Sequence, residues 1–391
     1  MSYARYLLKL SFKNKLNFFP IILPIGIIIF LAMMNTSAKE NTSYINSVGK
    51  EIHIMNTLHS DYQSILEEET LSEEDIEGMT LAISNLENNL ALSQQSVDYA
   101  VNGNWSESLN IQLDLLEKNA LANIENGTSL TEESYVRSMY NRKASYDILA
   151  EHNLEPEFSG IETKGFTFTY RMMDILFPAI FTICLITLLS NIFGGNLMDR
   201  LDIEDMFPVN QLKWQLKKIT LVYLISLLLC FMWYGLSLTI STLLNGSGSL
   251  HYPVNIYTDT FLETLPVSTL MGNGILLQSL AILFVVTTVY LISLLVKNQL
   301  TTLFVSAIIL IGPILLTGNV APLGIILHLL PTTYFNAIRV LTNQLAVENN
   351  NVNIKFGTGI YVLLLSVLLM VAIILCIKKH HEKNQLFNKN R

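Results

Sequence analysis

The chain has 391 residues, of which 51% are hydrophobic and only 14% are charged, and its mean hydropathy is +0.41. Soluble globular proteins carry about 25% charged residues, so this composition excludes an ordinary soluble domain and indicates a membrane protein. The formal net charge of −8 averages two unlike parts, because residues 35–169 hold 23 of the 32 acidic residues and only 7 of the 24 basic ones. The isoelectric point is therefore uninformative about partners.

The N-terminal segment, residues 1–17, carries four basic residues and no acidic one. Tyr3, Leu7 and Leu10 fall on one helical face and the basic residues on another, which predicts an amphipathic helix lying on the anionic cytoplasmic leaflet. Residues 18–34 form an apolar run that is just long enough for a first membrane span. The rival interpretation is a cleaved secretory signal. We expect the run to be retained, because the amphipathic start is long and further apolar runs follow.

Residues 35–169 are polar and acidic, contain no cysteine, and show helical periodicity. Ser72 with Asp75 three residues later is a capping-box arrangement, and Asn126-Gly127 is a stop signal. We expect an extracellular helical domain whose helices begin near Ile45, Ser72, Trp105 and Ser129. Aromatic and threonine residues alternate over 161–170, which predicts a short extended tether back to the bilayer.

The rest of the chain alternates apolar runs with short polar connections. We expect spans at 175–193, 219–244, 270–296, 301–317 and 359–377, a cytoplasmic loop at 194–218, re-entrant outer helices at 321–346 separated at Pro331, and a basic cytoplasmic tail at 378–391. The N-terminus, the loop, Lys297 and the tail hold 14 Lys and Arg residues, whereas the outer loops after the third and fifth spans hold only Arg339 and Lys355. The positive-inside rule then places both termini in the cytoplasm. The expected fold is an all-α polytopic membrane protein with six spans.

The loop is the one long polar stretch held between two apolar runs on the basic side. Its first part is amphipathic and acidic, and Pro208 ends it before a second helix that carries Lys213, Lys217 and Lys218. The predicted geometry is therefore a helix, an elbow and a second helix. A plain interfacial helix that only anchors the next span has the same pattern.

This loop resembles the segment between the second and third spans of ABC-2 type transporter permeases. The His328–Phe335 stretch, HLLPTTYF, is similar to the leucine-proline-aromatic segment before the last span of that family. The resemblance covers the membrane portion and depends on the order of the parts, whereas the long exterior domain departs from many members. It implies a type V exporter-like arrangement in the bacterial cell membrane, a second permease copy or sibling permease, and a coupling helix that docks on a cytosolic ABC ATPase. The coupling residues would be Arg200, Leu201, Asp202, Glu204, Asp205, Met206, Phe207 and Pro208.

No GxxxxGK[ST] phosphate-binding loop is present, and no catalytic triad, HExxH or Rossmann glycine pattern occurs either. We therefore expect no enzyme activity and no cofactor on this chain, with ATP and magnesium bound by the partner subunit. The acidic clusters at 67–69 and 73–77 are typical of solvated helix ends rather than of a metal site. The three cysteines lie singly in apolar runs and match no metal or disulfide spacing.

Polar residues within the expected spans are few and uncharged. The candidates for a transport pathway are Asn191, Ser237, Thr239, Asn273 and Gln278, although packing between helices is the favoured role for any single Ser or Thr among them. A proton-coupled transporter would need ionisable groups at this depth. The pattern favours an exporter of a hydrophobic or amphipathic cargo, such as an antimicrobial peptide or a drug, with sodium export or a lipid-linked polymer as further options. A sensor of extracellular peptides, an immunity protein, or a structural anchor would share this topology.

Overall fold

The protein is described by a computed structural model that covers residues 18–67, 72–127, 132–194, 197–198, 201–202, 211–257, 263–316 and 324–389. The chain is mostly helical and divides into two compact units. Unit 1 contains the chain up to Ala32, Phe168–Leu243, and Ser268 onward. Unit 2 contains Met33–Thr167 and Leu244–Val267.

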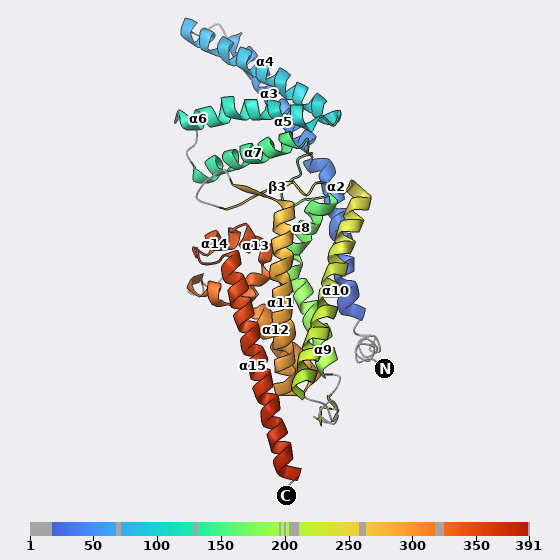
Figure 1. The fold of residues 1–391 in the computed structure, drawn as a ribbon. Coiled ribbons are helices and arrows are strands. Elements are labelled where there is room, and N and C mark those ends of the chain that lie inside the picture. Colours follow the sequence, from blue (N-terminus) through green and yellow to red (C-terminus); the bar gives the residue numbers. More distant parts are fainter. Residues whose placement is uncertain are drawn as a thin grey trace. The chain divides into compact units, whose positions relative to one another are not determined.

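Unit 1 is built from long apolar helices, and α9, α10, α11, α12 and α15 run roughly alongside one another (Figure 1). Its helices are α2 (Phe19–Thr42), α8 (Gly165–Ile175), the π-helix η3 (Phe177–Phe181), α9 (Thr182–Gly194), α10 (Gln211–Asn245), α11 (Val267–Val296), α12 (Gln299–Leu316) and α15 (Phe356–Lys389), the ends of some of which belong to unit 2. Among the residues covered, five stretches are long and apolar enough to cross a membrane: Phe19–Leu66, Phe177–Gly194, Lys213–Asn245, Val267–Val296 and Phe356–Lys379. The chain is thus a helical protein of polytopic membrane type. The remaining expected span corresponds to the shorter apolar helix Gln299–Leu315.

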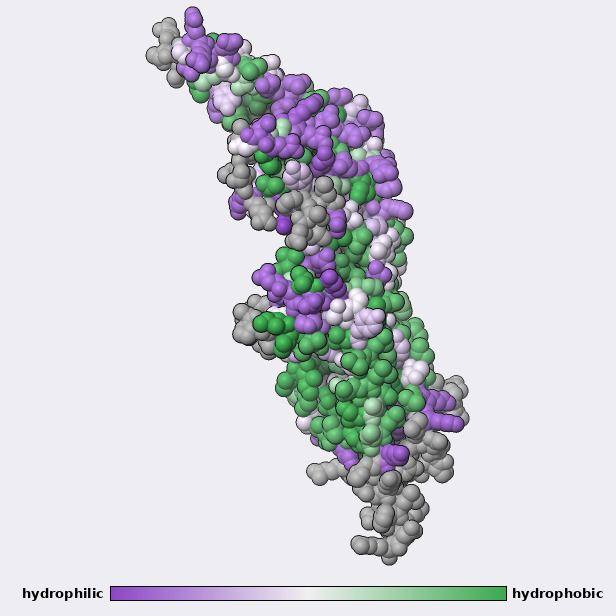
Figure 2. Space-filling model, turned by 60° about the vertical axis from the view of Figure 1, so that its left-hand side comes forward, coloured by the Kyte–Doolittle hydropathy of each residue, from purple (hydrophilic) through white to green (hydrophobic). Residues whose placement is uncertain are grey.

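The apolar helices differ in how much of their surface the unit itself covers. The most apolar window of α11 is 67% buried and the stretch Phe177–Gly194, which combines η3 and α9, is 72% buried, whereas the windows of α2, α10 and α15 are only 28%, 33% and 17% buried. Figure 2 shows hydrophobic residues gathered over the helices of this unit. Such a large exposed apolar surface is unusual for a soluble protein and suits contact with hydrocarbon. Helices α9 and α11 are therefore central, and the other three lie at the periphery.

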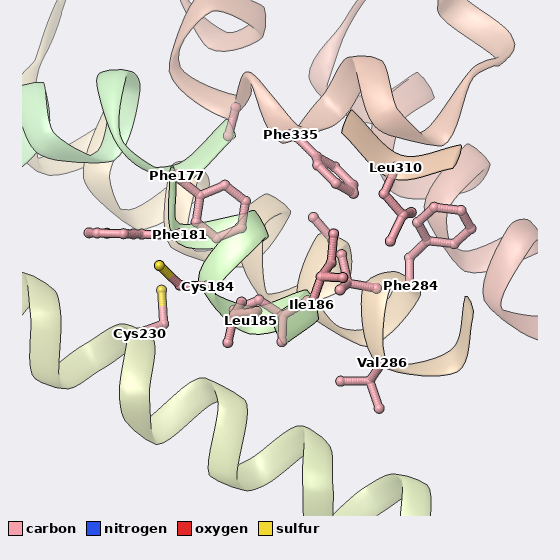
Figure 3. Packing of buried hydrophobic residues seen from close by; sticks show 14 of the residues in the cluster. Phe177, Phe181, Cys184, Leu185, Ile186, Cys230, Phe284, Val286, Leu310 and Phe335 are labelled. Carbon is pink, nitrogen blue, oxygen red and sulfur yellow. The ribbon is translucent and has the colours of Figure 1, made fainter. Parts of the chain in front are cut away.

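Aromatic residues fill the core around α9 (Figure 3). The ring of Phe335 lies 6.5 Å from that of Phe177 and 6.3 Å from that of Phe284, in edge-to-face geometry in both cases. Phe181 packs on Trp233 of α10 with ring centroids 4.5 Å apart. These pairs join η3, which leads into α9, to α10 and to the Pro331–Phe335 segment, and that segment to α11, through direct ring contacts that are stabilising beyond the area that they bury.

The segment before α15 is more broken than the two re-entrant helices expected over 321–346. It contains the 3-10 helices η6 (Leu327–Leu329) and η7 (Pro331–Phe335) and the short helices α13 (Ala337–Leu341) and α14 (Gln344–Glu348). The expected break at Pro331 is present, since Pro331 opens η7. A further break follows Phe335, because Asn336 leaves the helical conformation with ψ of 53°. Gly359 of α15 packs tightly here, since a Cβ at this position would lie 2.5 Å from Cδ1 of Tyr334.

Unit 2 is a helical bundle with a small hairpin, formed by β3 (Pro253–Asn255) and β4 (Thr264–Pro266) paired antiparallel. Its helices are α3 (Tyr44–Leu66), α4 (Glu73–Val101), α5 (Trp105–Leu115), the π-helix η2 (Leu116–Leu121), α6 (Ala122–Glu125) and α7 (Glu133–Glu151). The Ser72 cap is confirmed, since its hydroxyl accepts from the Asp75 N–H at 3.2 Å. The helix stop at Gly127 is confirmed as well, with φ of 68°. Ser129 lies outside the residues that the structure describes.

The bundle has its own hydrophobic core. The Tyr44 hydroxyl lies 3.0 Å from the hydroxyls of both Ser96 and Ser108, all of them buried. The Tyr44 ring also packs edge-on against Trp105 and Tyr146. One buried tyrosine thus joins α3, α4, α5 and α7.

The extended tether expected over 161–170 is wrong, because α8 begins at Gly165. The Glu157 carboxylate accepts hydrogen bonds from the N–H groups of Thr163 and Lys164, each at 2.8 Å, and from the Thr167 hydroxyl. Gly165 N–H donates to the Gly246 carbonyl at 2.9 Å. These hydrogen bonds satisfy the free N–H groups at the start of a helix. The stabilisation that they give to α8 is larger than the local preference for a strand.

The first helix expected in the loop at 194–218 is also wrong over residues 197–198 and 201–202. Leu197–Met198 (β1) pairs antiparallel with Leu201–Asp202 (β2) instead. The second expected helix is present as the start of α10 at Gln211, three residues after Pro208.

Candidate functional site

The expected coupling residues lie mostly outside the part of the chain that the structure describes. Arg200, Glu204, Asp205, Met206, Phe207 and Pro208 are all outside it, and Leu201 and Asp202 are described only as the backbone of β2. On either side of this segment, α9 ends at Gly194 and α10 begins at Gln211. The candidate site therefore consists of the end of α9 and the start of α10, which flank this segment, and of the residues that contact them.

A buried lysine lies in the first turns of α10. Lys218 is only 2% exposed, and its Nζ lies 5.7 Å from the ring centroid of Phe193 and 5.3 Å from that of Tyr290. Lys213 and Lys217 are exposed, although the sequence pattern put all three lysines together. Cation–π contacts of this kind favour an ammonium group between aromatic faces. We call Asn191, Phe193, Gln215, Lys218, Tyr290 and Gln299 the Lys218 cluster.

Side-chain hydrogen bonds tie the same helix ends together. The Tyr290 hydroxyl of α11 donates to Oε1 of Gln215 on α10, and both side chains are buried. Nε2 of Gln299 on α12 donates to Oδ1 of Asn191 on α9. The ring centroids of Phe193 and Tyr290 lie 4.8 Å apart. Four helices, α9 to α12, therefore meet at this cluster.

The backbones approach closely at the end of α9. A Cβ at Gly194 would lie 2.9 Å from Cα of Gln299, a separation that real Cβ atoms do not adopt. Glycine at this position allows α9 and the start of α12 to contact each other directly, as small residues do between membrane helices. Displacement of one of these helix ends would therefore be passed to the other.

The expected pathway residues have different surroundings. Gln278 of α11 is buried, accepts from the Tyr234 hydroxyl of α10 at 2.7 Å, and donates through Nε2 to the Met173 carbonyl of α8 at 3.0 Å. Asn191 belongs to the Lys218 cluster. Ser237 and Thr239 donate to carbonyls one turn back in their own helix, at 3.0 and 2.7 Å, and Asn273 is half-buried on α11. Gln278 and Asn191 thus connect helices.

Among the residues that the structure covers, no group of three or more His, Cys, Asp or Glu side chains is placed to hold a metal ion. Cys184 and Cys230 are buried free thiols whose side chains point toward one another from α9 and α10 (Figure 3), and Cys376 is exposed. The cysteines in the core therefore act as small packing residues.

Sequence reasoning missed the Lys218 cluster, although a signal was present. Lys213 and Lys217 are four residues apart and share one helical face, whereas Lys218 is three residues from Gln215 and shares another. A lysine and a glutamine on the same stripe at the start of a span mark a face that is polar and packed. The aromatic partners on α9 and α11 come from distant sequence and could not be assigned without the fold.

No family model matches the chain, and neither a curated protein nor a solved structure shows significant similarity to it.

Proposed function

We propose that this chain is the membrane subunit of an ATP-driven exporter of the ABC-2 permease type, energised by a separate cytosolic ATPase. The acidic segment at 200–208 would dock on the ATPase, and a second permease copy or sibling would complete the transporter. Both termini would be cytoplasmic. The chain has no phosphate-binding loop of its own, so the energy for transport must come from another polypeptide.

The Lys218 cluster is the observation that carries this proposal. The polar segment 195–210 joins α9 to α10, and the ends of these helices are locked to α11 and α12 by buried polar and aromatic contacts. A push on the segment would then move a group of four helix ends together, rather than one flexible loop. Rigid-body shifts of packed helices are a common way to convert such a push into a change of access.

The polar side chains of the apolar helices support the choice of cargo. Gln278 and Asn191 are used in contacts between helices. The expected spans contain no carboxylate or histidine between their ends, and an ion or proton relay would need such groups. A hydrophobic or amphipathic cargo, such as an antimicrobial peptide or a drug, fits spans of this composition best.

Co-purification tests the proposal directly. The full chain, co-expressed with candidate ABC ATPases and extracted in mild detergent, is expected to retain one of them and to stimulate or restrain its hydrolysis of ATP. Charge reversal at Asp202, Glu204 and Asp205 should release the ATPase. The matched control reverses Glu73, Glu74 and Asp75 at the start of α4, which lie in unit 2. Retention of the ATPase by the loop variant would exclude the coupling role.

A sensor or immunity function is the second candidate. It is favoured by the independent core of unit 2, which a simple permease would not need. The two functions differ in one readout, because a sensor would bind its peptide without any ATPase present. A chain that associates with no ATPase but protects cells against a peptide would support the sensor.

A further inference from the structure

Unit 2 contains a cavity of about 160 Å³ between its helices. Seven of its ten lining residues are polar, which separates it from the dry gaps of a hydrophobic core. The lining residues are Glu51, Met55, Asn89, Ser93, Gln112, Leu115, Leu116, Asn119, Arg142 and Tyr146. All of them belong to the helical bundle of α3, α4, α5, η2 and α7 (Figure 1).

Each helix contributes one face to this cavity. Glu51 and Met55 are one turn apart on α3, Asn89 and Ser93 are one turn apart on α4, and Arg142 and Tyr146 are one turn apart on α7. The fourth wall passes from α5 into the π-helix η2 at Leu116. π-Helical turns occur often at functional sites, because they widen the helix and re-aim side chains.

The floor of the cavity offers a hydrogen-bond donor. Nε2 of Gln112 is buried, and no acceptor in the described part of the chain lies within hydrogen-bond distance of it. Ser93 is also buried, with 2% exposure, and places a hydroxyl nearby. Buried polar groups normally have partners, so Nε2 of Gln112 is placed to donate a hydrogen bond to an acceptor on a bound molecule.

The rim carries one positive and one negative group. Arg142 and Glu51 are both exposed and both line the cavity. Tyr146 lies within the field of both: burial raises its pKa to about 12, the Arg142 charge opposes this rise, and the Glu51 charge adds to it. A ligand that carries a carboxylate and an ammonium group would match this pair of charges, whereas a singly charged ion would be repelled by one of them.

Size decides between classes of ligand. Sites for drug-sized molecules measure about 300–1,000 Å³, and a cavity of about 150 Å³ is enough to hold benzene. At about 160 Å³ the enclosed space matches a molecule of about benzene size rather than a drug or a folded peptide. The lining is polar, so that molecule would be polar as well.

We propose that this cavity is a binding site for a small zwitterionic amino acid. The carboxylate would be bound by the Arg142 guanidinium and by Nε2 of Gln112, and the ammonium group by the Glu51 carboxylate. The side chain would lie against Met55 and Leu115. This site is independent of the transport proposal, since it lies within unit 2 and uses none of the coupling residues.

Isothermal titration calorimetry of the full chain in lipid nanodiscs, against each of the twenty amino acids, tests the site. We expect a subset of small amino acids to bind, and their amides, which lack the carboxylate, to bind more weakly. Arg142→Gln and Glu51→Gln should each reduce affinity by about tenfold or more, the loss typical of a charge-assisted hydrogen bond. Arg137→Gln on α7 and Glu77→Gln on α4 are the matched controls, because neither residue lines the cavity.

Two results would overturn the inference. One is the absence of heat for every amino acid at concentrations up to about 10 mM, which excludes any useful affinity. The other is binding that survives both Arg142→Gln and Glu51→Gln unchanged, because the ligand would then sit elsewhere. Thermal unfolding of each variant without ligand shows whether the bundle is intact, so that a lost fold is not mistaken for a lost site.

Discussion

Gln278 distinguishes a residue that holds helices together from one that lines a pathway. Its carbonyl oxygen accepts from the Tyr234 hydroxyl at 2.7 Å, and its amide donates to the Met173 carbonyl at 3.0 Å. Tyr234→Phe removes only the first of these bonds, because phenylalanine keeps the ring in place. Gln278→Leu removes both and leaves a buried hydroxyl and a carbonyl without that partner.

The magnitudes follow from the number of bonds lost. Hydrogen bonds between membrane helices contribute about 0.6 kcal/mol on average and about 1.7 kcal/mol at most. Tyr234→Phe should therefore lower the free energy of unfolding by about 1 kcal/mol, and Gln278→Leu by about 1–3 kcal/mol, because leaving buried groups unpaired is more costly. The double variant should be little worse than Gln278→Leu alone. The resulting coupling energy of about 1 kcal/mol would identify a direct pair.

Unfolding in mixed detergent and denaturant, followed by circular dichroism, measures these differences. Tyr223→Phe is the matched control on the same helix, since Tyr223 is half-buried and its loss should change stability by less than about 0.5 kcal/mol. If the two single effects simply add, Gln278 and Tyr234 are not paired in the folded protein. A Gln278→Leu variant of normal stability but altered transport would instead place Gln278 in the pathway.

Three further changes test other contacts. Gly359→Ala should destabilise unit 1 by about 1–3 kcal/mol, because the methyl group of the alanine would overlap the ring of Tyr334. Gly357 on the same helix has open space around it, so Gly357→Ala should stabilise the protein by up to about 1 kcal/mol in the same unfolding assay. Lys218→Ala should lower the free energy of unfolding by about 2 kcal/mol, because the contacts of the ammonium group with aromatic rings are lost. Lys217 is exposed, so Lys217→Ala should lower it by less than about 0.5 kcal/mol. Equal effects of the two changes would contradict the buried position of Lys218. Burial alone would raise the pKa of Glu155, but the hydrogen bonds and charges of two lysines outweigh burial and lower this pKa. The ionised Glu155 therefore contributes its full stabilisation above the ordinary carboxyl pKa near 4.5, and this stabilisation is lost as the pH falls through the lowered pKa. Glu155→Gln should therefore flatten the acid limb of the stability profile of the chain, and an unchanged limb would refute the ion pairs.

Local signals in the sequence were sufficient for most helices. The Ser72 cap and the Gly127 stop depend on contacts within a few residues, and both are present in the structure. The apolar runs are long enough to be recognised without tertiary information, and five of them form helices of crossing length. Where a distant residue controls the backbone, sequence reasoning failed. The start of α8 is capped by Glu157 and by the carbonyl of Gly246, and neither is visible in the local alternation of aromatic and threonine residues.

For the candidate site too, sequence reasoning found what depends on neighbouring residues and missed what depends on distant ones. The polar segment between α9 and α10 was predicted from composition, because a polar stretch between two apolar runs has few alternatives, whereas its Pro208 boundary lies outside the described residues. The partners of Lys218 were not found, since Phe193 and Tyr290 lie 25 residues before and 72 residues after it. Which of three neighbouring lysines is buried depends on the rotation of α10 against α9 and α11. That rotation is set by tertiary packing.

The transport account depends most on the contact between the polar segment and an ATPase. A photo-crosslinking amino acid placed at Ile203, within the segment that joins α9 to α10, measures this contact in intact cells. The account predicts an adduct with a protein that contains a GxxxxGK[ST] phosphate-binding loop, and no such adduct when the crosslinker replaces Leu81, an exposed residue of α4 in unit 2. Crosslinks from Ile203 that contain no such protein would contradict it.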